Sequence, residues 1–335
     1  MHKSQRRSMQ RPGAEYAFQA EWITGRGKLL WLAMVMGALG GGAFIVSSVL
    51  NLVTGDDFRL VSLTGLVIVA VGKGVFHLAF LGRPERFWRA FARPHSSWIS
   101  RGIFILSIFS LLAAAYLAAS WMGASPGLVS GLQWAATLMA AFLVTYDGFL
   151  LRDAKAIAFW QTPILPILFA SAAALAGVGV SFLLIPYFME VRESTMRVVE
   201  LIDRIILIGL VGLVAAYLWT MHAAECAARR SVLELLRGQV SGMFLATCLI
   251  AIIVPGLVAV YGMFGYVPLH VLTAAGLAEI TGEFAIKFVV LRAGVYTPLI
   301  PQSAQGGGGA LAALQLPKLT ANPRPVSPFP PAQRM

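Results

Sequence analysis

The chain has 335 residues, of which 58% are hydrophobic and only 12% are charged, and its mean hydropathy is +0.76. Soluble domains carry about a quarter charged residues, so this composition excludes a soluble globular protein and indicates an all-α integral membrane protein. The net charge of +11 does not indicate nucleic acid, because the basic residues lie in short loops between apolar runs. The two cysteines have no CxxC or CxxH spacing, so we expect no metal in this chain.

A helix needs about 20 mostly apolar residues to cross the hydrocarbon core of a bilayer. Eight runs meet this requirement and predict one bundle of eight transmembrane helices. In chain order, the runs cover residues 29–52, 60–81, 101–122, 127–151, 162–189, 201–221, 240–263 and 267–292. We therefore expect a basic N-terminal segment (1–28), a membrane domain (29–300) and a tail (301–335). The tail is rich in glycine and proline and cannot bury enough surface to fold alone.

The Lys and Arg residues of the predicted loops give the orientation of the bundle. An even number of spans places both termini on one side, and that side holds twenty basic residues against four on the other. The positive-inside rule therefore predicts that both termini are cytoplasmic, in a multi-pass protein of a bacterial cytoplasmic (inner) membrane.

We single out six ionisable residues inside the predicted spans, where a charge is costly and usually functional. They are Lys73 and His77 in the second span, Asp147 in the fourth, and Glu279, Glu283 and Lys287 in the eighth. Residues four apart share a helical face, so those of the eighth span form a stripe about 12 Å long. All six are expected in the cytoplasmic half of the membrane. A structural interpretation remains open, in which Glu283 pairs with Lys287, Lys73 snorkels and His77 is an interfacial cap.

Together with Tyr146, some of these residues suit a quinone head group. Such a group needs hydrogen-bond donors for its carbonyls, a proton donor or acceptor, and apolar walls for its tail. Tyr146, Asp147 and His77 supply the first two kinds of group at a plausible depth in the membrane.

Three groups of sequence motifs lie at the ends of the predicted spans and in the loops beside them. They are His77-Leu-Ala-Phe-Leu-Gly-Arg-Pro-Glu-Arg-Phe-Trp88 with Ser96-Ser-Trp-Ile-Ser-Arg-Gly102, Tyr146-Asp-Gly-Phe-Leu-Leu151 with Phe159-Trp-Gln-Thr-Pro-Ile-Leu-Pro166, and Val289-Val-Leu-Arg-Ala-Gly294. Together they resemble the NrfD/PsrC family, the polysulphide reductase type of membrane subunit, over most of the chain and with the same eight helices.

The resemblance implies a haem-free anchor that binds menaquinone or ubiquinone. It also implies an iron-sulfur subunit docked on this chain, which connects the quinone to a molybdopterin catalytic subunit. The quinone-contacting tyrosine of the family falls on Tyr146. The polar contacts that some members place at the start of the first helix do not carry over, because Leu29 and Leu32 stand there.

The loop between the second and third spans is strongly basic, with five arginines in 19 residues against one carboxylate, Glu85. Such a field favours encounter with an acidic partner, and we predict that the loop docks the iron-sulfur subunit. Contact with anionic lipid headgroups is the alternative. Many relatives present their catalytic subunits outside the membrane, whereas the positive excess here suggests a complex that faces the cytoplasm. The residues assigned to docking are Arg83, Arg86, Arg89 and Arg93.

Other functions fit parts of the sequence less well. A haem b anchor needs two histidines on facing helices, and only His77 and His222 qualify on one side. A secondary transporter should show paired broken helices in two related halves, and the sequence has no such repeat. An ion-translocating subunit remains open because Glu279 is near mid-membrane. The outer half offers few partners for it, namely Tyr261, Tyr266 and His270. Without a path to that side, quinone protons should exchange with the cytoplasm and turnover should be electroneutral.

Overall fold

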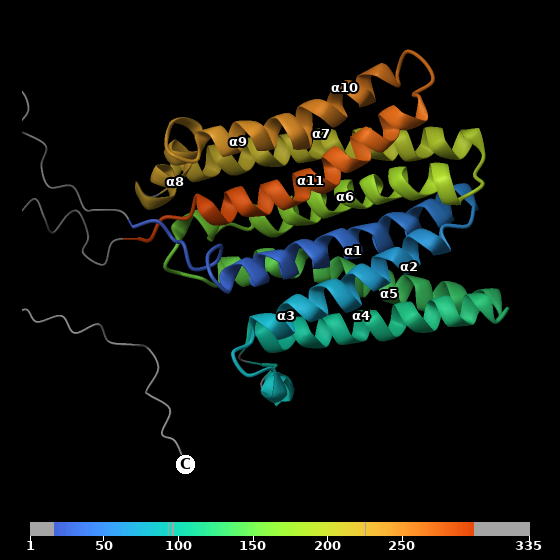
Figure 1. The fold of residues 1–335 in the computed structure, drawn as a ribbon, viewed down its shortest axis with the longest axis horizontal. Coiled ribbons are helices and arrows are strands. Elements are labelled where there is room, and N and C mark those ends of the chain that lie inside the picture. The colour runs from blue at the N-terminus through green and yellow to red at the C-terminus, as the bar shows by residue number, and fades with distance from the viewer. Residues whose placement is uncertain (1–16, 93, 96, 225, 298–335) are drawn as a thin grey trace, which may run out of the picture. The chain divides into compact units, whose positions relative to one another are not determined.

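The computed structural model of the chain describes residues 17–297, with positions 93, 96 and 225 omitted. The predicted tail and most of the predicted N-terminal segment therefore lie outside the described residues. The described residues are almost entirely helical, and the long helices run side by side (Figure 1). Their one strand-like pairing is an antiparallel bridge between Phe18 and Val295. The prediction of an all-helical protein is confirmed for this part of the chain.

Six of the predicted apolar runs coincide with single long helices. These are α1 (Gly27–Thr54), α4 (Trp98–Trp121), α5 (Pro126–Arg152), α6 (Ile164–Phe188), α7 (Glu193–Ala223) and α11 (Leu269–Arg292). We call the end of the bundle where α1 begins and α11 ends the Arg292 end, and the opposite one the Thr54 end. Shorter helices lie outside the predicted runs: η2 (Pro84–Ala92), η3 (Ala158–Trp160) and α8 (Cys226–Arg237).

The two other predicted runs are helices interrupted by a wide π-helical turn. The second run consists of α2 (Arg59–Val67), η1 (Ile68–Lys73) and α3 (Gly74–Phe80), and the seventh of α9 (Ser241–Cys248), η4 (Leu249–Ile253) and α10 (Val254–Tyr261). In the seventh run, Pro255 has no N–H for the carbonyl of Ala251, and its ring crowds that carbonyl, which accounts for a local widening. In the second run, the wide turn ends at the buried Lys73. Such turns often occur at functional sites.

Among the described residues, six helical segments are long and apolar enough to cross a membrane. They are α1, the continuous segment Arg59–Phe80, α4, α5, α6 and the continuous segment Ser241–Tyr261. The remaining long helices, α7 and α11, run alongside them in Figure 1 and pack against α6. The structure therefore has the architecture of a helical membrane protein.

Glycines allow the central helices to touch backbone to backbone. A Cβ atom on Gly42 of α1 would lie 1.8 Å from the carbonyl oxygen of Ala173 in α6. On the other side of α6, a Cβ atom on Gly276 of α11 would lie 2.6 Å from the carbonyl oxygen of Gly179. Small residues permit this close approach in membrane proteins, where packing rather than hydrophobic burial drives helix association. Helix α6 is thereby held between α1 and α11.

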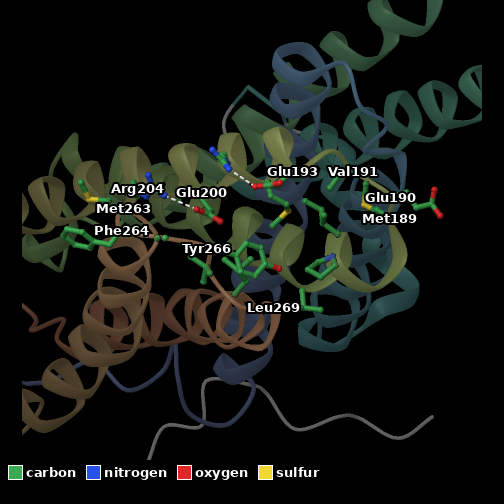
Figure 2. Close-up of a pocket in the computed structure, with 18 residues that line it drawn as sticks. Met189, Glu190, Val191, Glu193, Glu200, Arg204, Met263, Phe264, Tyr266 and Leu269 are labelled. Carbon is green, nitrogen blue, oxygen red and sulfur yellow. Dashed lines mark hydrogen bonds and ion pairs between the residues drawn. The ribbon is translucent and has the colours of Figure 1, made fainter.

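A cavity of about 990 Å³ opens at the Thr54 end (Figure 2). Its walls come from the end of α6, the beginning of α7 and the α10–α11 connection. Beside it, Arg192 and Thr195 bind Asp56 of the α1–α2 loop, with 2.9 Å between the arginine and the carboxylate. The hydrogen bond from Thr195, followed by those from Arg192, holds the pKa of Asp56 below its ordinary value. The ionised carboxylate thus ties this loop to the start of α7.

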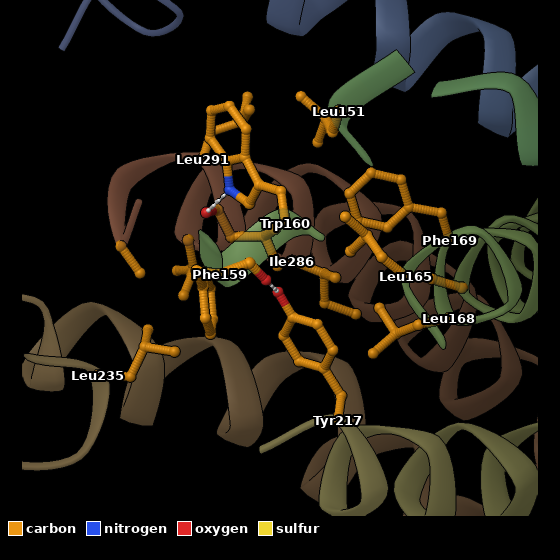
Figure 3. Packing of buried hydrophobic residues seen from close by; sticks show 14 of the residues in the cluster. Leu151, Phe159, Trp160, Leu165, Leu168, Phe169, Tyr217, Leu235, Ile286 and Leu291 are labelled. Carbon is orange, nitrogen blue, oxygen red and sulfur yellow. Dashed lines mark hydrogen bonds between the residues drawn. The ribbon is translucent and has the colours of Figure 1, made fainter. Parts of the chain in front are cut away.

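At the Arg292 end, aromatic side chains close the bundle (Figure 3). The indole N–H of Trp160 donates to the carbonyl oxygen of Val290 at 3.0 Å, and the hydroxyl of Tyr217 donates to that of Phe159 at 2.7 Å. Gly294 leaves room for the indole, because a Cβ atom there would lie 3.0 Å from it. Hydrogen-bonded aromatics therefore hold the short η3 connection against the end of α11.

Candidate functional site

Lys73 and Asp147 form a buried ion pair between η1 and α5. Their Nζ and Oδ1 atoms are 3.2 Å apart, and the two side chains are 2% and 0% exposed. The ammonium also donates to the carbonyl oxygen of Ala33 in α1 at 3.3 Å. Gly37 makes room for it, since a Cβ atom there would lie 2.7 Å from Nζ. Lys73 therefore points into the bundle, and the interpretation of a snorkelling lysine is wrong.

Asp147 keeps one oxygen free for chemistry. Its Oδ2 atom is buried and has no hydrogen-bond partner among the described residues. A buried carboxylate oxygen without a partner is costly, and it can accept a proton or a hydrogen bond from a ligand. The predicted role of Asp147 as a proton acceptor is compatible with this geometry.

Tyr146 lies beside the ion pair and is itself buried. Its hydroxyl donates to the carbonyl oxygen of Trp98 at 3.0 Å, and the ammonium of Lys73 is 5.8 Å from the centre of its ring. Gly102 of α4 admits the phenol, because a Cβ atom there would lie 2.4 Å from Cζ. The hydroxyl thus presents its lone pairs, and it must release Trp98 before it can donate to a ligand.

A cavity of about 450 Å³ adjoins this tyrosine site. It lies between η2 and the beginning of α4, and its lining includes Arg89, Ser97 and Ser100. Ser97 is the N-cap of α4 and accepts from the N–H of Ser100 at 3.3 Å. Trp98, which receives the Tyr146 hydroxyl, stands between these two serines. The cavity therefore lies next to the backbone that holds Tyr146.

His77 is one helical turn beyond Lys73 and lies on the same face. It is half-buried, and its Nδ1 atom is buried without a hydrogen-bond partner among the described residues. His222, the other histidine weighed for haem, is exposed at the end of α7. An exposed position does not suit a ligand of a buried haem.

The α11 stripe is buried along its whole length. Lys287 and Glu283 form an ion pair of 3.0 Å with both side chains 0% exposed, as the structural interpretation predicted. The Lys287 ammonium also lies 3.9 Å from the ring centre of Phe169 in α6. The charge of Lys287 acts on Lys73, and that of Asp147 acts on Glu283. The two buried ion pairs are therefore electrostatically coupled within the bundle.

Glu279 meets a residue that the sequence interpretation missed. It is 2% exposed, both of its carboxyl oxygens lack hydrogen-bond donors in the described part of the chain, and Gly179 packs against it. Asp203 of α7, which is 4% exposed, faces Glu279 within hydrogen-bonding reach. Asp203 stands at the edge of the predicted span 201–221, next to Arg204, and was not among the predicted site residues. The feature that shows Asp203 to be an interior residue is the length of α7, which begins ten residues before Asp203.

The predicted docking arginines lie on an exposed segment at the Arg292 end. Arg83, Arg86 and Arg89 are all exposed, and the only ion pair among them joins Arg86 to Glu85 at 4.0 Å. Arg89 stacks over Trp88, which is 60% exposed, with 5.5 Å to the ring centre. Arg93 lies outside the described residues. No group of three or more His, Cys, Asp or Glu suited to a metal ion occurs in the described chain.

Comparison with known proteins places the chain in a family. Residues 27–299 match the family described as "Polysulphide reductase, NrfD". The chain belongs to the NrfD family. It is also similar to a sulfite dehydrogenase subunit of Allochromatium vinosum, with 33% identity over 164 residues. That match covers 44% of this chain and 48% of the relative, about half of each. The predicted family is confirmed, and the chain is a multi-pass helical membrane protein.

In this NrfD protein, the three motif groups have different structural roles. The stretches that contain Phe159 and Val290 close the Arg292 end, as Figure 3 shows for the η3 aromatics. The stretches that contain His77 and Tyr146 surround the Lys73–Asp147 ion pair instead. Two buried polar atoms without a hydrogen-bond partner among the described residues, Nδ1 of His77 and Oδ2 of Asp147, lie in these latter stretches.

Proposed function

We propose that this chain is the quinone-binding membrane anchor subunit of a molybdopterin/iron-sulfur oxidoreductase. In this proposal, α7 and α11 complete eight spans, and both termini face the cytoplasm of a bacterium. The subunit exchanges electrons between menaquinone or ubiquinone and an iron-sulfur subunit. Membership of the NrfD family supports a redox role, and the name of the relative, which is one subunit of a sulfite dehydrogenase, supports a place in a multi-subunit complex.

The observation that carries the proposal is the buried group formed by Tyr146, Asp147 and Lys73. A quinone takes up two protons with two electrons when it is reduced and releases them when it is oxidised. The free Oδ2 atom of Asp147 can hold a proton, and the Lys73 ammonium can donate to a carbonyl oxygen. The hydroxyl of Tyr146 is held in place by its hydrogen bond to the carbonyl oxygen of Trp98. These residues supply both the hydrogen bonds and the proton exchange that a quinone head group needs.

The remaining polar groups extend this site. His77 is next to Lys73 and offers a half-buried nitrogen without a partner. Glu283 and Lys287 form the next ion pair, so they can relay protons to and from Asp147. Glu279 lies on the same stripe of α11, one turn before Glu283.

Electrons reach the site from a partner at the Arg292 end. The three exposed arginines of the η2 region give this end a positive surface, and the Tyr146 site lies nearby, next to the cavity between η2 and α4. An acidic iron-sulfur subunit would be attracted to this surface and held close to the quinone. A molybdopterin subunit then docks on the iron-sulfur subunit and carries the substrate chemistry.

The test is quinone-linked turnover of the assembled complex with Tyr146→Phe or Asp147→Asn. Each variant should lower turnover at least about tenfold, because a hydrogen-bond donor or a proton acceptor is lost beside the reacting carbonyl. Thr145→Val is the matched control, because its hydroxyl bonds only within its own helix. The control should keep turnover within about twofold, and unchanged turnover in both site variants would contradict the site.

A further inference from the structure

A second buried polar site lies toward the Thr54 end, away from Tyr146. Asp203 and Glu279 come from different helices and are 4% and 2% exposed. Three of their four carboxyl oxygens have no hydrogen-bond donor in the described part of the chain. Two ionised carboxylates offer only acceptors, so two carboxyl groups in hydrogen-bonding contact need a proton between them. The contact is satisfied when the pair shares one proton.

The cavity at the Thr54 end leads to this pair along two helices. On α7, Glu200 and Arg204 line the cavity, and Asp203 lies between them in sequence without lining it. On α11, Leu272 lines the cavity, and Glu279 lies two turns further along the helix on the same face, about 10 Å away. The cavity therefore reaches the turn of α7 that carries Asp203, and Glu279 faces Asp203 from α11.

The cavity lining is charged, with three carboxylates against two guanidinium groups. Arg197 pairs with Glu193 at 2.6 Å, and Arg204 pairs with Glu200 at 3.0 Å (Figure 2). Glu190 is the third carboxylate of the lining, so the lining has a small excess of negative charge, which favours cations. The guanidinium Nε atom of Arg204, the residue after Asp203, is buried without a partner among the described residues. Charged groups therefore reach from solvent to the carboxyl pair.

From Glu279 the polar groups continue toward the quinone site. Glu283 and Lys287 follow at intervals of four residues, each step about 6 Å along α11. Lys287 then acts electrostatically on Lys73, the partner of Asp147. The sequence offered only Tyr261, Tyr266 and His270 for this half of the membrane. Asp203, Glu200 and Arg204 supply the groups that were missing.

We propose that Asp203 and Glu279 are a proton-sharing carboxyl pair that exchanges protons with the Thr54 side through the cavity and with the quinone site through the α11 stripe. The proposal rests on the proposed quinone site. Each step moves one proton: a hydronium ion in the cavity protonates a carboxylate oxygen of the pair, and the pair releases a proton to the Glu283 carboxylate. Quinone reduction draws protons along this route, and quinol oxidation sends them back. Charge then crosses the membrane, so turnover is electrogenic rather than electroneutral.

The test measures membrane potential and quinone-linked turnover together, with the intact complex reconstituted in proteoliposomes. The wild type should develop a potential during turnover. Asp203→Asn and Glu279→Gln should each lower the potential per electron transferred at least about fivefold, because the shared proton site is removed while side-chain size is kept. Asp57→Asn is the matched control, because it is a carboxylate at the same end that pairs with Arg59 and does not line the cavity. It should leave the ratio unchanged.

A second measurement needs no turnover. Dicyclohexylcarbodiimide reacts with protonated carboxyl groups in apolar surroundings. In the resting complex it should label Asp203 or Glu279, as mass spectrometry of the peptides would show, and leave the exposed Asp57 unlabelled. A wild-type complex with neither residue labelled would overturn the carboxyl pair, even if the variants assemble poorly.

The outcomes separate this inference from the proposed function. Quinone-linked turnover without a membrane potential, or an unchanged ratio in both variants, would overturn the proton route and leave the quinone site intact. A potential that requires Na⁺ would overturn the assignment to protons. Absence of quinone-linked turnover in the wild type would instead contradict the proposed function, while the labelling still tests the carboxyl pair.

Discussion

At the scale of single residues, the Lys73–Asp147 ion pair shows why a charge inside this bundle needs a partner. Removing an ion from water costs several kcal/mol even after relaxation, and only close pairing with hydrogen bonds offsets that cost. Lys73 has both, in Asp147 and in the carbonyl of Ala33. The unbonded oxygen of Asp147 leaves the pair incomplete on one side. That side is where we place the quinone head group.

Structural and functional roles of the pair can be separated by substitution. Lys73→Met or Asp147→Leu alone should destabilise the protein by about 3–5 kcal/mol, because each leaves an unpaired buried charge. The double variant Lys73→Met/Asp147→Leu should regain most of that stability, since no charge remains, yet quinone-linked turnover should stay low. Thermal unfolding of the detergent-purified protein and turnover of the complex measure the two effects. Equal stability of the single variants and the wild type would contradict a structural role.

The sequence identified these residues but not their pairing. Spacing grouped Lys73 with His77 and Asp147 with Tyr146, because spacing is informative only within one helix. The ion pair joins positions 74 residues apart, and it depends on how η1 and α5 pack around α1. Asp203 was missed for a related reason, because hydropathy alone does not tell the interfacial end of a long helix from its buried part.

At the scale of helices, hydropathy predicted where the helices lie in the sequence but not the π-helical turns that interrupt two of them. All eight predicted runs coincide with helical segments, because each run is long and apolar enough to require internal hydrogen bonding. The π-helical turns at Ile68–Lys73 and Leu249–Ile253 were not predicted. They depend on packing against α1 and α11, and no local composition signals them except Pro255. Helix α8 was missed because its amphipathic sequence is too polar for a span.

The η2 segment carries a prediction of its own. Arg83→Glu with Arg86→Glu should release the iron-sulfur partner from the purified complex at moderate salt, because an attractive surface becomes repulsive. Arg237→Glu is a suitable control, because it reverses an exposed charge at the end of α8, outside η2. Gel filtration of the complex measures the effect. An intact complex with the double variant would favour contact with lipid headgroups instead.

At the scale of the whole molecule, the polar groups divide between the two ends. The Tyr146 site and the η2 arginines lie toward the Arg292 end, whereas the charged cavity and the Asp203–Glu279 pair lie toward the Thr54 end. Helix α11 connects them, because it carries Glu279, Glu283 and Lys287 on one buried face. The direction in which the proposed proton route would move charge therefore depends on which end faces the cytoplasm.

Reporter fusions test that orientation directly. The positive-inside rule predicts that the Arg292 end is cytoplasmic, because the predicted loops and terminal segments on that side hold twenty basic residues and those on the other side hold four. A reporter after Ile300, which lies beyond the described residues, should signal a cytoplasmic location. A reporter in the turn at Gly123–Ser125 should signal the outside. This turn suits an insertion because Gly123 is exposed, has a φ of 69°, and a Cβ atom there would meet nothing within 4 Å.

The expected pattern would place the iron-sulfur partner in the cytoplasm and the cavity at the Thr54 end on the outside. Quinone reduction would then draw protons inward through Asp203 and Glu279, and quinol oxidation would release them outside. The reverse pattern would place the partner outside and turn the cavity toward the cytoplasm. The same carboxyl pair would then carry protons in the opposite sense, because the route is fixed in the bundle and only its orientation in the membrane has changed.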